Sequence, residues 1–462
     1  MENLDIQARI REVMAEENNT RIARASLLPS LDVGATGLQI DKDRSEAGAM
    51  PERSGTLDLS AQLVFAEPAL ANVSVQSSLQ SSREQDLEIT RLNTVLDGSR
   101  LYMNYLRAKK IFFILLENLK LLRTNLEIAR VRQATGAAGQ EETLRWEVEI
   151  ASLRKNAMAI QSQVNQALYG LKQVLNIPLL YVLDVSDVSL DDSSFLISNP
   201  EVRTYLEDPL SFDLLSDFLT VEGARRAPEL QQLDYVISAQ ERALTSTRLS
   251  YFIPTVSAFG KYSDRFYASE ISSPFQIPPI TSAPPPSTPG ESFLYELLGS
   301  ISPKLPGDQS WSVGVQLSLN LFQGFATTAS EDRSSLILEQ YRIQREALSQ
   351  KVALRIRLEM EKAKASYFAI QQSRLEQDAA RKTLELVAES YSRGGVSILS
   401  LLDAQNSALR ADVVAANALY DFLLDYLSLQ RAIGKMDILM TEEEREDVLR
   451  RLRAHMAAVP RK

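Results

Sequence analysis

The stretch Trp311–Phe322, WSVGVQLSLNLF, decides the fold. From Trp311 to Leu321 every second residue is apolar, and the residues between them are Ser, Gly, Gln or Asn. An alternation of period two over this length predicts a β-strand with one apolar and one polar face. Weaker alternation predicts three further strands, at about residues 30–38, 56–65 and 255–262.

Strands of this kind allow two interpretations. The first is a soluble sandwich or a half-exposed sheet. The second is a membrane β-barrel, whose strands of about 9–11 residues face lipid on one side and water on the other. Four strands cannot close a barrel alone, since known barrels begin at about eight. A barrel would therefore need several copies of the chain.

The same order of elements occurs twice along the chain. A helix, two strands, a long helix, a glycine turn and a helix are followed by a second set, with Gly136 and Gly394 at equivalent positions 258 residues apart. We therefore divide the chain into a first repeat, an acidic mixed segment, a second repeat and a charged C-terminal tail, at residues 1–181, 182–226, 227–436 and 437–462. A Pro-rich loop, 263–310, separates the two strands of the second repeat.

The helices are unusually long. Residues 325–393 contain neither Gly nor Pro, which allows a continuous helix of roughly 100 Å. Its apolar residues form two stripes, one through Ile343, Leu354 and Leu358 and the other through Val352 and Ile356. A single coiled-coil seam needs only one stripe. Two stripes predict that each helix packs against neighbours on both sides, as in the wall of a cylinder.

Composition excludes most kinds of chemistry. The 462 residues include no Cys and a single His, His455, and carry a net charge of −10. The absence of Cys and the single His exclude disulfides, thiolate sites and His-rich zinc sites. The negative net charge argues against a general nucleic-acid binder, which would be basic. The segment around Asp191 and Asp192 lacks the Gly and the Glu that an EF-hand calcium loop needs at fixed positions. Adjacent carboxylates on a helix point in different directions, which argues against their acting together on one substrate. We expect no metal, no cofactor, no nucleic-acid partner and no enzyme activity.

Nothing in the sequence predicts a membrane helix or an export signal. No run of about 18 apolar residues is present, and the first 20 residues are polar with a helical pattern. The protein is then either cytosolic, or the sequence starts after an export signal. A soluble coiled-coil scaffold would explain the helices, but it leaves the alternation after Trp311 unexplained.

Three motifs, taken in order, resemble the TolC-like outer membrane efflux proteins. They are Leu27–Leu31 at the entry to the first strand, Leu319–Gly324 at the exit from the last strand, and Tyr391–Gln405 around the second glycine turn. The resemblance covers roughly residues 1–436. It implies a mainly α fold with a small β part. Duplicated long antiparallel helices form a trimeric α-barrel, and four strands per chain contribute to a shared 12-stranded membrane β-barrel.

The resemblance also implies a function. The protein would be the outer-membrane exit duct of a tripartite efflux pump or a type I secretion system, reaching into the periplasm of a bacterium and doing no chemistry. Its partners would be two further copies of itself as a homotrimer, a periplasmic adaptor (membrane fusion) protein, an inner-membrane transporter and outer-membrane lipid. The alternative function is the soluble coiled-coil structural or scaffold protein.

The resemblance also implies functional sites, at the residues that match the family's motifs by position. The pore constriction would lie at Asp403 and Ser400, and a gate link would be a hydrogen bond between Tyr391 and Glu142. The turns that contact the adaptor would be formed by Gly136, Ala137, Gly394, Gly395 and Val396. Two plainer interpretations stay open: the glycines only reverse the chain, and Asp403 is a solvated residue favoured by the dipole of its helix.

Three aromatic residues are candidates for the membrane boundary. Trp311 opens a predicted strand, while Phe65 and Phe322 close theirs. Aromatic side chains gather at the lipid–water boundary of membrane barrels, which predicts a membrane girdle formed by these three residues. The alternative is that the two phenylalanines are simple core residues.

Overall fold

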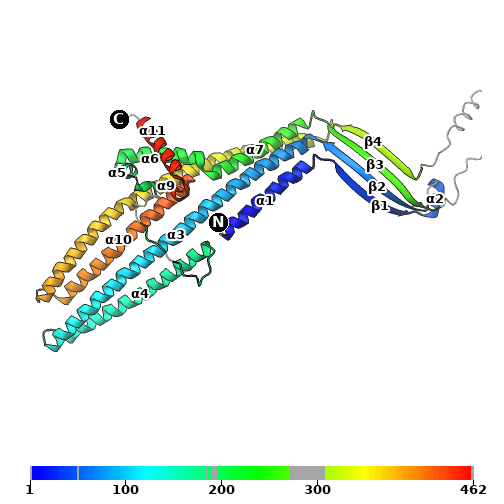
Figure 1. Ribbon diagram of the computed structural model, residues 1–462. Helices are drawn as coiled ribbons and strands as arrows, with labels where there is room; N and C mark the ends of the chain where they lie inside the picture. Colours follow the sequence, from blue (N-terminus) through cyan, green and yellow to red (C-terminus); the bar gives the residue numbers. More distant parts are fainter. Residues whose placement is uncertain (1–2, 49–50, 184, 189–194, 270–306, 459–462) are drawn as a thin grey trace, which may run out of the picture. The chain divides into compact units, whose positions relative to one another are not determined.

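A computed structural model describes residues 3–48, 51–183, 185–188, 195–269 and 307–458 (Figure 1). The chain forms two compact units. The helical unit comprises residues 1–16, 79–237 and 339–462, and the sheet unit comprises residues 17–78 and 238–338. These units do not coincide with the two sequence repeats. Each repeat gives its strands to one shared sheet and much of its helices to one shared bundle, so both repeats are present in both units.

The sheet unit contains a single antiparallel sheet in the order β1-β2-β3-β4. The strands are β1 (Ser30–Gln39), β2 (Arg53–Phe65), β3 (Thr255–Ala268) and β4 (Gln309–Ser318). A short helix, α2 (Lys42–Gly48), lies between β1 and β2 and was not predicted.

Two predicted boundaries in the second repeat are wrong. Strand β3 continues to Ala268 because it stays paired with β2 as far as Ser54, and β4 begins at Gln309 and ends at Ser318. The predicted Pro-rich loop, 263–310, therefore includes the ends of two strands. Its central part, residues 270–306, lies outside the described residues.

Four helices begin or end beside the strands. They are α1 (Leu4–Ala25), α3 (Glu67–Ala134), α7 (Pro228–Leu249) and α9 (Ala326–Ser392). Within the sheet unit, α3 begins with a buried carboxylate, Glu67, which pairs with both terminal nitrogens of Arg242 on α7 at 2.7 and 3.1 Å. The prediction of unusually long helices is confirmed, since α3 has 68 residues and α9 has 67.

No helix among the described residues is both long enough and apolar enough to cross a bilayer.

In the helical unit, four helices follow one another in the order α4, α3, α10, α9 (Figure 1). Helix α4 (Gln140–Val174) packs on α3, and α10 (Ile398–Ile433) contacts α3 through an ion pair of 2.8 Å between Arg107 and Asp421. Helix α9 pairs with α10 through Arg381 and Asp412, also at 2.8 Å. Helices α4 and α9 are therefore the two edges of this layer.

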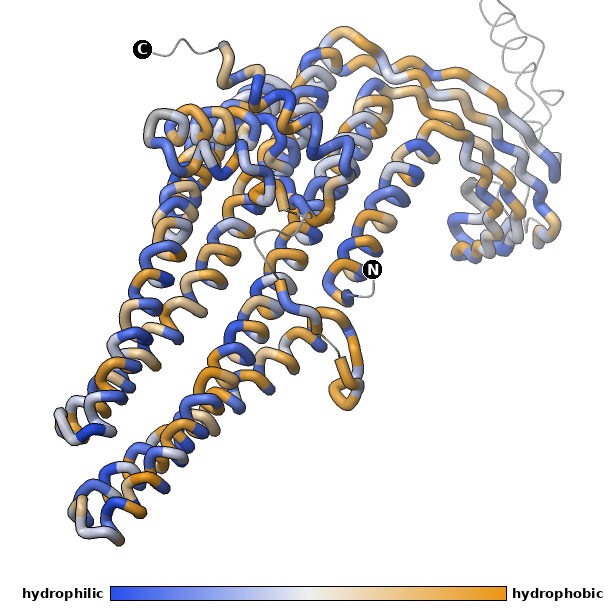
Figure 2. The backbone as a smooth tube through the Cα atoms, turned by 60° about the vertical axis from the view of Figure 1, so that its left-hand side comes forward, coloured by the Kyte–Doolittle hydropathy of each residue, from blue (hydrophilic) through white to orange (hydrophobic). Residues whose placement is uncertain are grey.

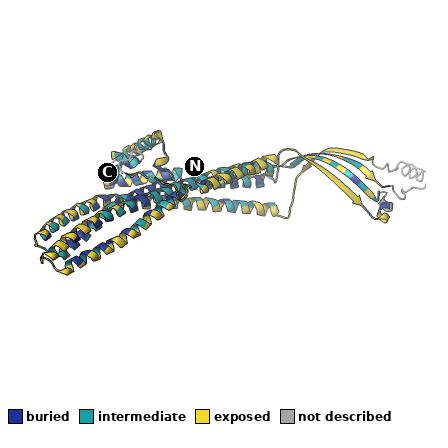
Figure 3. Ribbon diagram, turned by 60° about the horizontal axis from the view of Figure 1, so that its bottom comes forward, coloured by how far each residue is buried: buried dark blue, intermediate teal, exposed yellow. Residues whose placement is uncertain are grey.

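The two apolar stripes of α9 have different environments. Val352 and Ile356 are buried against α10, within a cluster that includes Phe422 and Leu423. Ile343, Leu354 and Leu358 are more than half exposed. Figure 3 shows the same alternation of buried and exposed turns along the long helices. Within a single chain, only the stripe through Val352 and Ile356 is buried. The stripe through Ile343, Leu354 and Leu358 is exposed at the α9 edge of the layer.

The acidic segment and the C-terminal tail fold together beside the long helices. They form η1 (Leu196–Ser198), α5 (Pro200–Glu207), α6 (Pro209–Arg226), η3 (Asp437–Leu439) and α11 (Glu442–Ala458). Phe212, Phe218 and Leu452 are buried there. The tail is thus a packed helix as far as Ala458, although its sequence shows mainly charge. Asp191 and Asp192, the weak calcium candidates, lie outside the described residues.

A buried carboxylate connects these segments. Asp437, only 3% exposed, accepts hydrogen bonds from the Tyr426 hydroxyl and from the Leu196 backbone N–H, the latter at 2.8 Å. Its own N–H donates to Gln430 at 3.1 Å. Burial raises the pKa of Asp437 to about 6, although the hydrogen bonds from Tyr426 and Leu196 and the charge of Arg445 act in the opposite direction.

Candidate functional site

The four-stranded sheet has one apolar and one polar face. On the apolar face, Val33 lies opposite Leu59, and Tyr262 lies opposite Trp311. The other apolar members of this face are Leu31, Ala35, Leu57, Ala61, Leu63, Phe65, Val256, Ala258, Val313, Val315 and Leu317, and two polar residues, Asp264 and Gln309, lie on it beyond Tyr262 and Trp311. Trp311, Val313, Val315 and Leu317 are all more than 60% exposed. A contiguous exposed apolar face of this kind is typical of a surface that contacts a partner or lipid.

The opposite face carries charge and small polar residues. Asp58 and Lys261 form an ion pair of 3.1 Å on it, and Ser60, Gln62 and Ser312 line the same side. One aromatic, Phe259, covers Gly314, where an added Cβ would lie 2.7 Å from the ring. A larger residue at this position would have to displace the Phe259 ring.

The predicted girdle residues occupy different settings. Trp311 is the third residue of β4 and pairs with Tyr262, so an aromatic pair lies at one end of the apolar face. Phe65 ends β2 at the other end and is half exposed. Phe322 does not close a strand, which corrects the prediction. It lies beyond Ser318, the last residue of β4, and its ring makes an edge contact with Phe325.

The two glycine turns have the same backbone geometry. Gly136 and Gly394 take φ values of 75° and 76°, in the left-handed region that favours glycine. The next residue in each turn donates its N–H back to the helix, Ala137 to the Arg132 carbonyl at 2.8 Å and Gly395 to the Ser390 carbonyl at 2.9 Å. This is the Schellman pattern of helix termination. The following helices, α4 and α10, begin at equivalent residues, 140 and 398.

The turns present a small, exposed apex. Gly136, Ala137, Gly394 and Gly395 are exposed, while Val396 is half-buried against the core between the helix pairs. No heavy atom lies within 4 Å of a Cβ added to Gly136 or Gly394. Their backbone conformation alone therefore accounts for the glycine, and open space surrounds both positions.

Ser400 and Asp403 lie on one face of the first turns of α10. Both are exposed, and their spacing of three residues puts them on the same side of the helix. Ser397 caps the helix and accepts the Ser400 N–H at 3.4 Å. In the first repeat the equivalent residues are Glu142 and Arg145, and Arg145 pairs with Glu141 at 2.6 Å. The two turns thus share a backbone but differ in the charge they carry.

The predicted hydrogen bond between Tyr391 and Glu142 is not formed. The Tyr391 hydroxyl is buried without a hydrogen-bond partner among the described residues. Arg132 occupies the place between them instead. Its guanidinium lies over the Tyr391 ring, 4.8 Å from the centroid, and one of its nitrogens is 3.7 Å from a Glu142 oxygen. Sequence reasoning missed Arg132 because it comes from α3, more than 250 residues from Tyr391.

Four buried polar atoms at this seam make no hydrogen bond among the described residues, although two of them, from Arg132 and Glu142, form the ion pair of 3.7 Å. They belong to Arg132 (Nη1), Glu142 (Oε1), Trp146 (Nε1) and Tyr391 (Oη). A buried polar group without a partner costs about 1–3 kcal/mol. Close to the turns, the polar atoms buried between the α3–α4 and α9–α10 pairs therefore contribute little to holding the pairs together, although the apolar side chains of Leu401 and Leu402 pack there.

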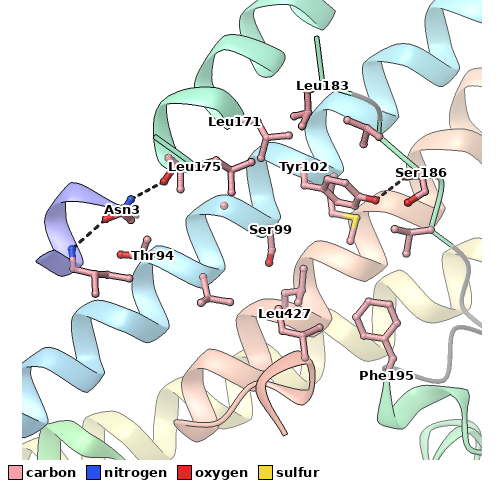
Figure 4. Close-up of a pocket in the computed structure, with 18 residues that line it drawn as sticks. Asn3, Thr94, Ser99, Tyr102, Leu171, Leu175, Leu183, Ser186, Phe195 and Leu427 are labelled. Carbon is pink, nitrogen blue, oxygen red and sulfur yellow. Dashed lines mark hydrogen bonds between the residues drawn. The ribbon is translucent and has the colours of Figure 1, made fainter. Parts of the chain in front are cut away.

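A cavity of about 620 Å³ lies above α3 in the helical unit (Figure 4). Its lining is mainly apolar, including Leu171, Leu427 and Phe195. The segment after α4 crosses it and is fixed by the Tyr102 hydroxyl, which donates to the Ser186 carbonyl at 2.7 Å. The described residues include no group of three or more His, Asp or Glu side chains that could hold a metal ion.

Comparison with known proteins identifies the family of this chain. The family model described as "Outer membrane efflux protein" matches residues 1–176 and 300–435, which is more than half of the chain. The protein belongs to this family and to the bacterial outer membrane.

Individual relatives are distant. Nodulation protein T of Rhizobium leguminosarum bv. trifolii is 20% identical over 445 residues, which cover 94% of this chain and 83% of the relative. The solved structure of CusC has a TM-score of 0.72 at 16% identity, covering 94% of this chain and 90% of that one. The Campylobacter jejuni CmeC outer membrane channel has a TM-score of 0.68 at 14% identity, covering 98% and 87%. These likenesses confirm the predicted fold class, mainly α with a small β part.

Proposed function

We propose that this protein is a passive exit duct, assembled from three copies of the chain, for an efflux pump or a type I secretion system. The observation that carries the proposal is the division of the sheet into an exposed apolar face and a polar face. Four strands cannot close a membrane barrel, but three copies supply twelve, and closure leaves no sheet edge unpaired. The apolar face would contact lipid, with Trp311 and Phe65 at its two boundaries.

The helical unit supplies the second part of the proposal. Its layer has two open edges, at α4 and α9, and the exposed stripe of α9 needs a neighbour. Three copies in a ring would join each α9 edge to an α4 edge and form a wall of helices. A scaffold of coiled coils accounts for these helices, but not for a sheet with an exposed apolar face.

The turns and the adjoining face of α10 are the proposed pore end. Asp403 would form a ring of three carboxylates, and Ser400 a ring of three hydroxyls one turn nearer the end. Gly136, Ala137, Gly394, Gly395 and Val396 would contact a periplasmic adaptor, which links the duct to an inner-membrane transporter. The duct itself carries out no chemistry, and the transporter supplies the energy.

Conductance of the purified protein in planar bilayers tests this function. A ring of carboxylates favours cations, so we expect a cation-preferring channel. Asp403→Asn should reduce that preference, and Ser400→Asp should increase it. Arg145→Asn is the matched control at the equivalent place in the first repeat. Electron microscopy of the same preparation should show three-fold particles. A folded monomer without conductance would overturn the proposal.

A further inference from the structure

An exposed apolar loop follows α4 in the helical unit. In Leu179, Leu180, Tyr181 and Val182 every side chain is more than half exposed, and Leu180 is 97% exposed. In Figure 2 the segment after α4 stands out as a continuous hydrophobic loop. Four consecutive exposed apolar residues are unusual on a surface without a partner. We refer to these residues as the 179–182 loop.

The 179–182 loop has a defined conformation. The amino group of Lys172, a buried residue on α4, donates to the Leu179 carbonyl at 2.6 Å. The Tyr181 N–H donates to the Pro178 carbonyl at 3.0 Å, and the Ile177 N–H donates to the Lys172 carbonyl at 2.8 Å. A loop held in place before it binds loses little conformational freedom on binding, which favours association.

A groove lies on the opposite edge of the same helical layer. It has a volume of about 490 Å³ and is formed by α5 and α9. Phe368 and Leu375 are its exposed apolar side chains, and Arg203, Glu207, Arg374 and Asp378 surround them. Tyr367 closes one end, where its hydroxyl donates to Glu207 at 2.9 Å. We refer to this feature as the α5–α9 groove.

The loop and the Tyr367–Phe368 end of the groove lie at similar heights along the helices, whereas Leu375 is eight residues, about 12 Å, further toward the turn on α9. Gly170 on α4 is beside Leu101 on α3, so the loop, bonded to Lys172, lies at the level of Leu101. Tyr367 contacts Phe422, the neighbour of Asp421, which pairs with Arg107 on α3. Leu101 and Arg107 are six residues apart, or about 9 Å along a helix.

We infer that the 179–182 loop of one copy docks into the α5–α9 groove of the next copy around the ring. This inference rests on the proposed trimer. The loop lies at the α4 edge and the groove at the α9 edge, and rotation about an axis parallel to the helices keeps both at their heights. One loop and one groove per chain give a heterologous contact that closes when the ring is complete.

The side chains of the 179–182 loop are complementary to those of the α5–α9 groove. Leu180 and Val182 supply apolar groups for the exposed ring of Phe368. The Tyr181 hydroxyl supplies a donor and acceptor for the charged rim of the groove. An apolar centre with a polar rim is the usual anatomy of a stable protein interface.

Cysteine cross-linking tests this contact, because the chain contains no native Cys. A chain carrying Leu180→Cys and Phe368→Cys, isolated from the outer membrane and oxidised, should give covalent trimers on a non-reducing gel. Two differently tagged chains, one with L180C and one with F368C, should give a covalent dimer that carries both tags. The matched control joins L180C to L399C, an exposed leucine near the turn of α10, and should give no cross-link.

Three outcomes would overturn the inference. Trimers seen by microscopy that fail to cross-link L180C to F368C would exclude the contact but leave the proposed function standing. A cross-link formed only within single chains would do the same. A preparation without trimers would overturn the proposed function as well. As a second measurement, Leu180→Ser with Val182→Ser should lower the temperature at which trimers dissociate in detergent, whereas Leu399→Ser should not.

Discussion

The guanidinium of Arg132 on α3 lies over the ring of Tyr391 on α9 and also faces the Glu142 carboxylate on α4. One side chain thereby joins both helix pairs directly beside their turns. The tyrosine takes part through its ring, since its hydroxyl has no partner among the described residues.

Substitution of Arg132 should loosen this seam. A cation–π contact is worth about 0.5–2 kcal/mol, so Arg132→Ala should accelerate amide hydrogen exchange around Glu142 and Tyr391 roughly tenfold, the equivalent of about 1.4 kcal/mol. Tyr391→Phe is the matched control, because it keeps the ring, and it should leave exchange unchanged. If Tyr391→Phe accelerates exchange as much as Arg132→Ala, the hydroxyl is in use and the ring contact is not the link.

Breaking the ion pair between Glu67 and Arg242 should strongly destabilise the sheet unit. Glu67 is buried, so Arg242→Ala leaves an uncompensated buried charge and should destabilise the protein by roughly 3 kcal/mol. Arg248→Ala is the control, because Arg248 is exposed where it pairs with Glu331 and such pairs contribute about 0–1 kcal/mol. Thermal unfolding of both variants in detergent checks this. Equal losses would show that burial of Glu67 does not matter.

The two faces of β4 should respond oppositely to charge. Val315 lies on the apolar face and Gln316 on the polar face. A lysine in the lipid-facing belt of a membrane barrel costs about 2–4 kcal/mol near the bilayer centre. Val315→Lys should therefore reduce the yield of folded protein in the outer membrane, while Gln316→Lys should be tolerated. Gel mobility with and without heating measures the folded fraction. The reverse order would mean that the apolar face does not contact lipid.

Asp437 should make stability fall as pH rises. Its pKa is raised to about 6 in the folded protein from an ordinary 3.8. The folded state then holds the proton more tightly than the unfolded state. The stabilisation is complete below about pH 3.8 and lost above about pH 6. At 1.36 kcal/mol per tenfold change in acid constant, the loss is about 3 kcal/mol.

The Asp437→Asn variant isolates this contribution from that of other carboxylates. The difference in unfolding free energy between the wild-type protein and the variant should shrink or change sign between pH 4 and pH 7. Denaturant unfolding at a series of pH values measures it. A constant difference across that range would show that Asp437 does not titrate there.

The strands and long helices could be predicted because their patterns are local. Alternation after Trp311 indicates a strand without reference to any other segment, and the absence of Gly and Pro over residues 325–393 indicates a long helix. The ends of the strands were less predictable. Apolar alternation continues to Leu321, but β4 stops at Ser318, where its pairing with β3 at Thr255 ends.

The packed tail and the Arg132 contact depend on partners far away in sequence. Helix α11 has few apolar residues among many charges, so its burial of Leu452 becomes evident only beside Phe218 and Leu429. The prediction for Tyr391 named a partner in the correct turn but the wrong residue. Family position suggests where a link lies, whereas the rotamer of a neighbouring arginine decides which groups meet.

The repeated turn has a consequence for protein engineering. An interval of 258 residues relates Gly136 to Gly394 and the start of α4 to the start of α10, yet it also relates Arg145 to Asp403. The backbone is thus copied while the charge is reversed. Each six-residue segment, 140–145 and 398–403, carries a net charge of −1, so the reversal is confined to this one pair of positions. Exchanging Arg145 and Asp403 alone would therefore move the positive side chain from α4 to α10 without redesigning the path of the chain.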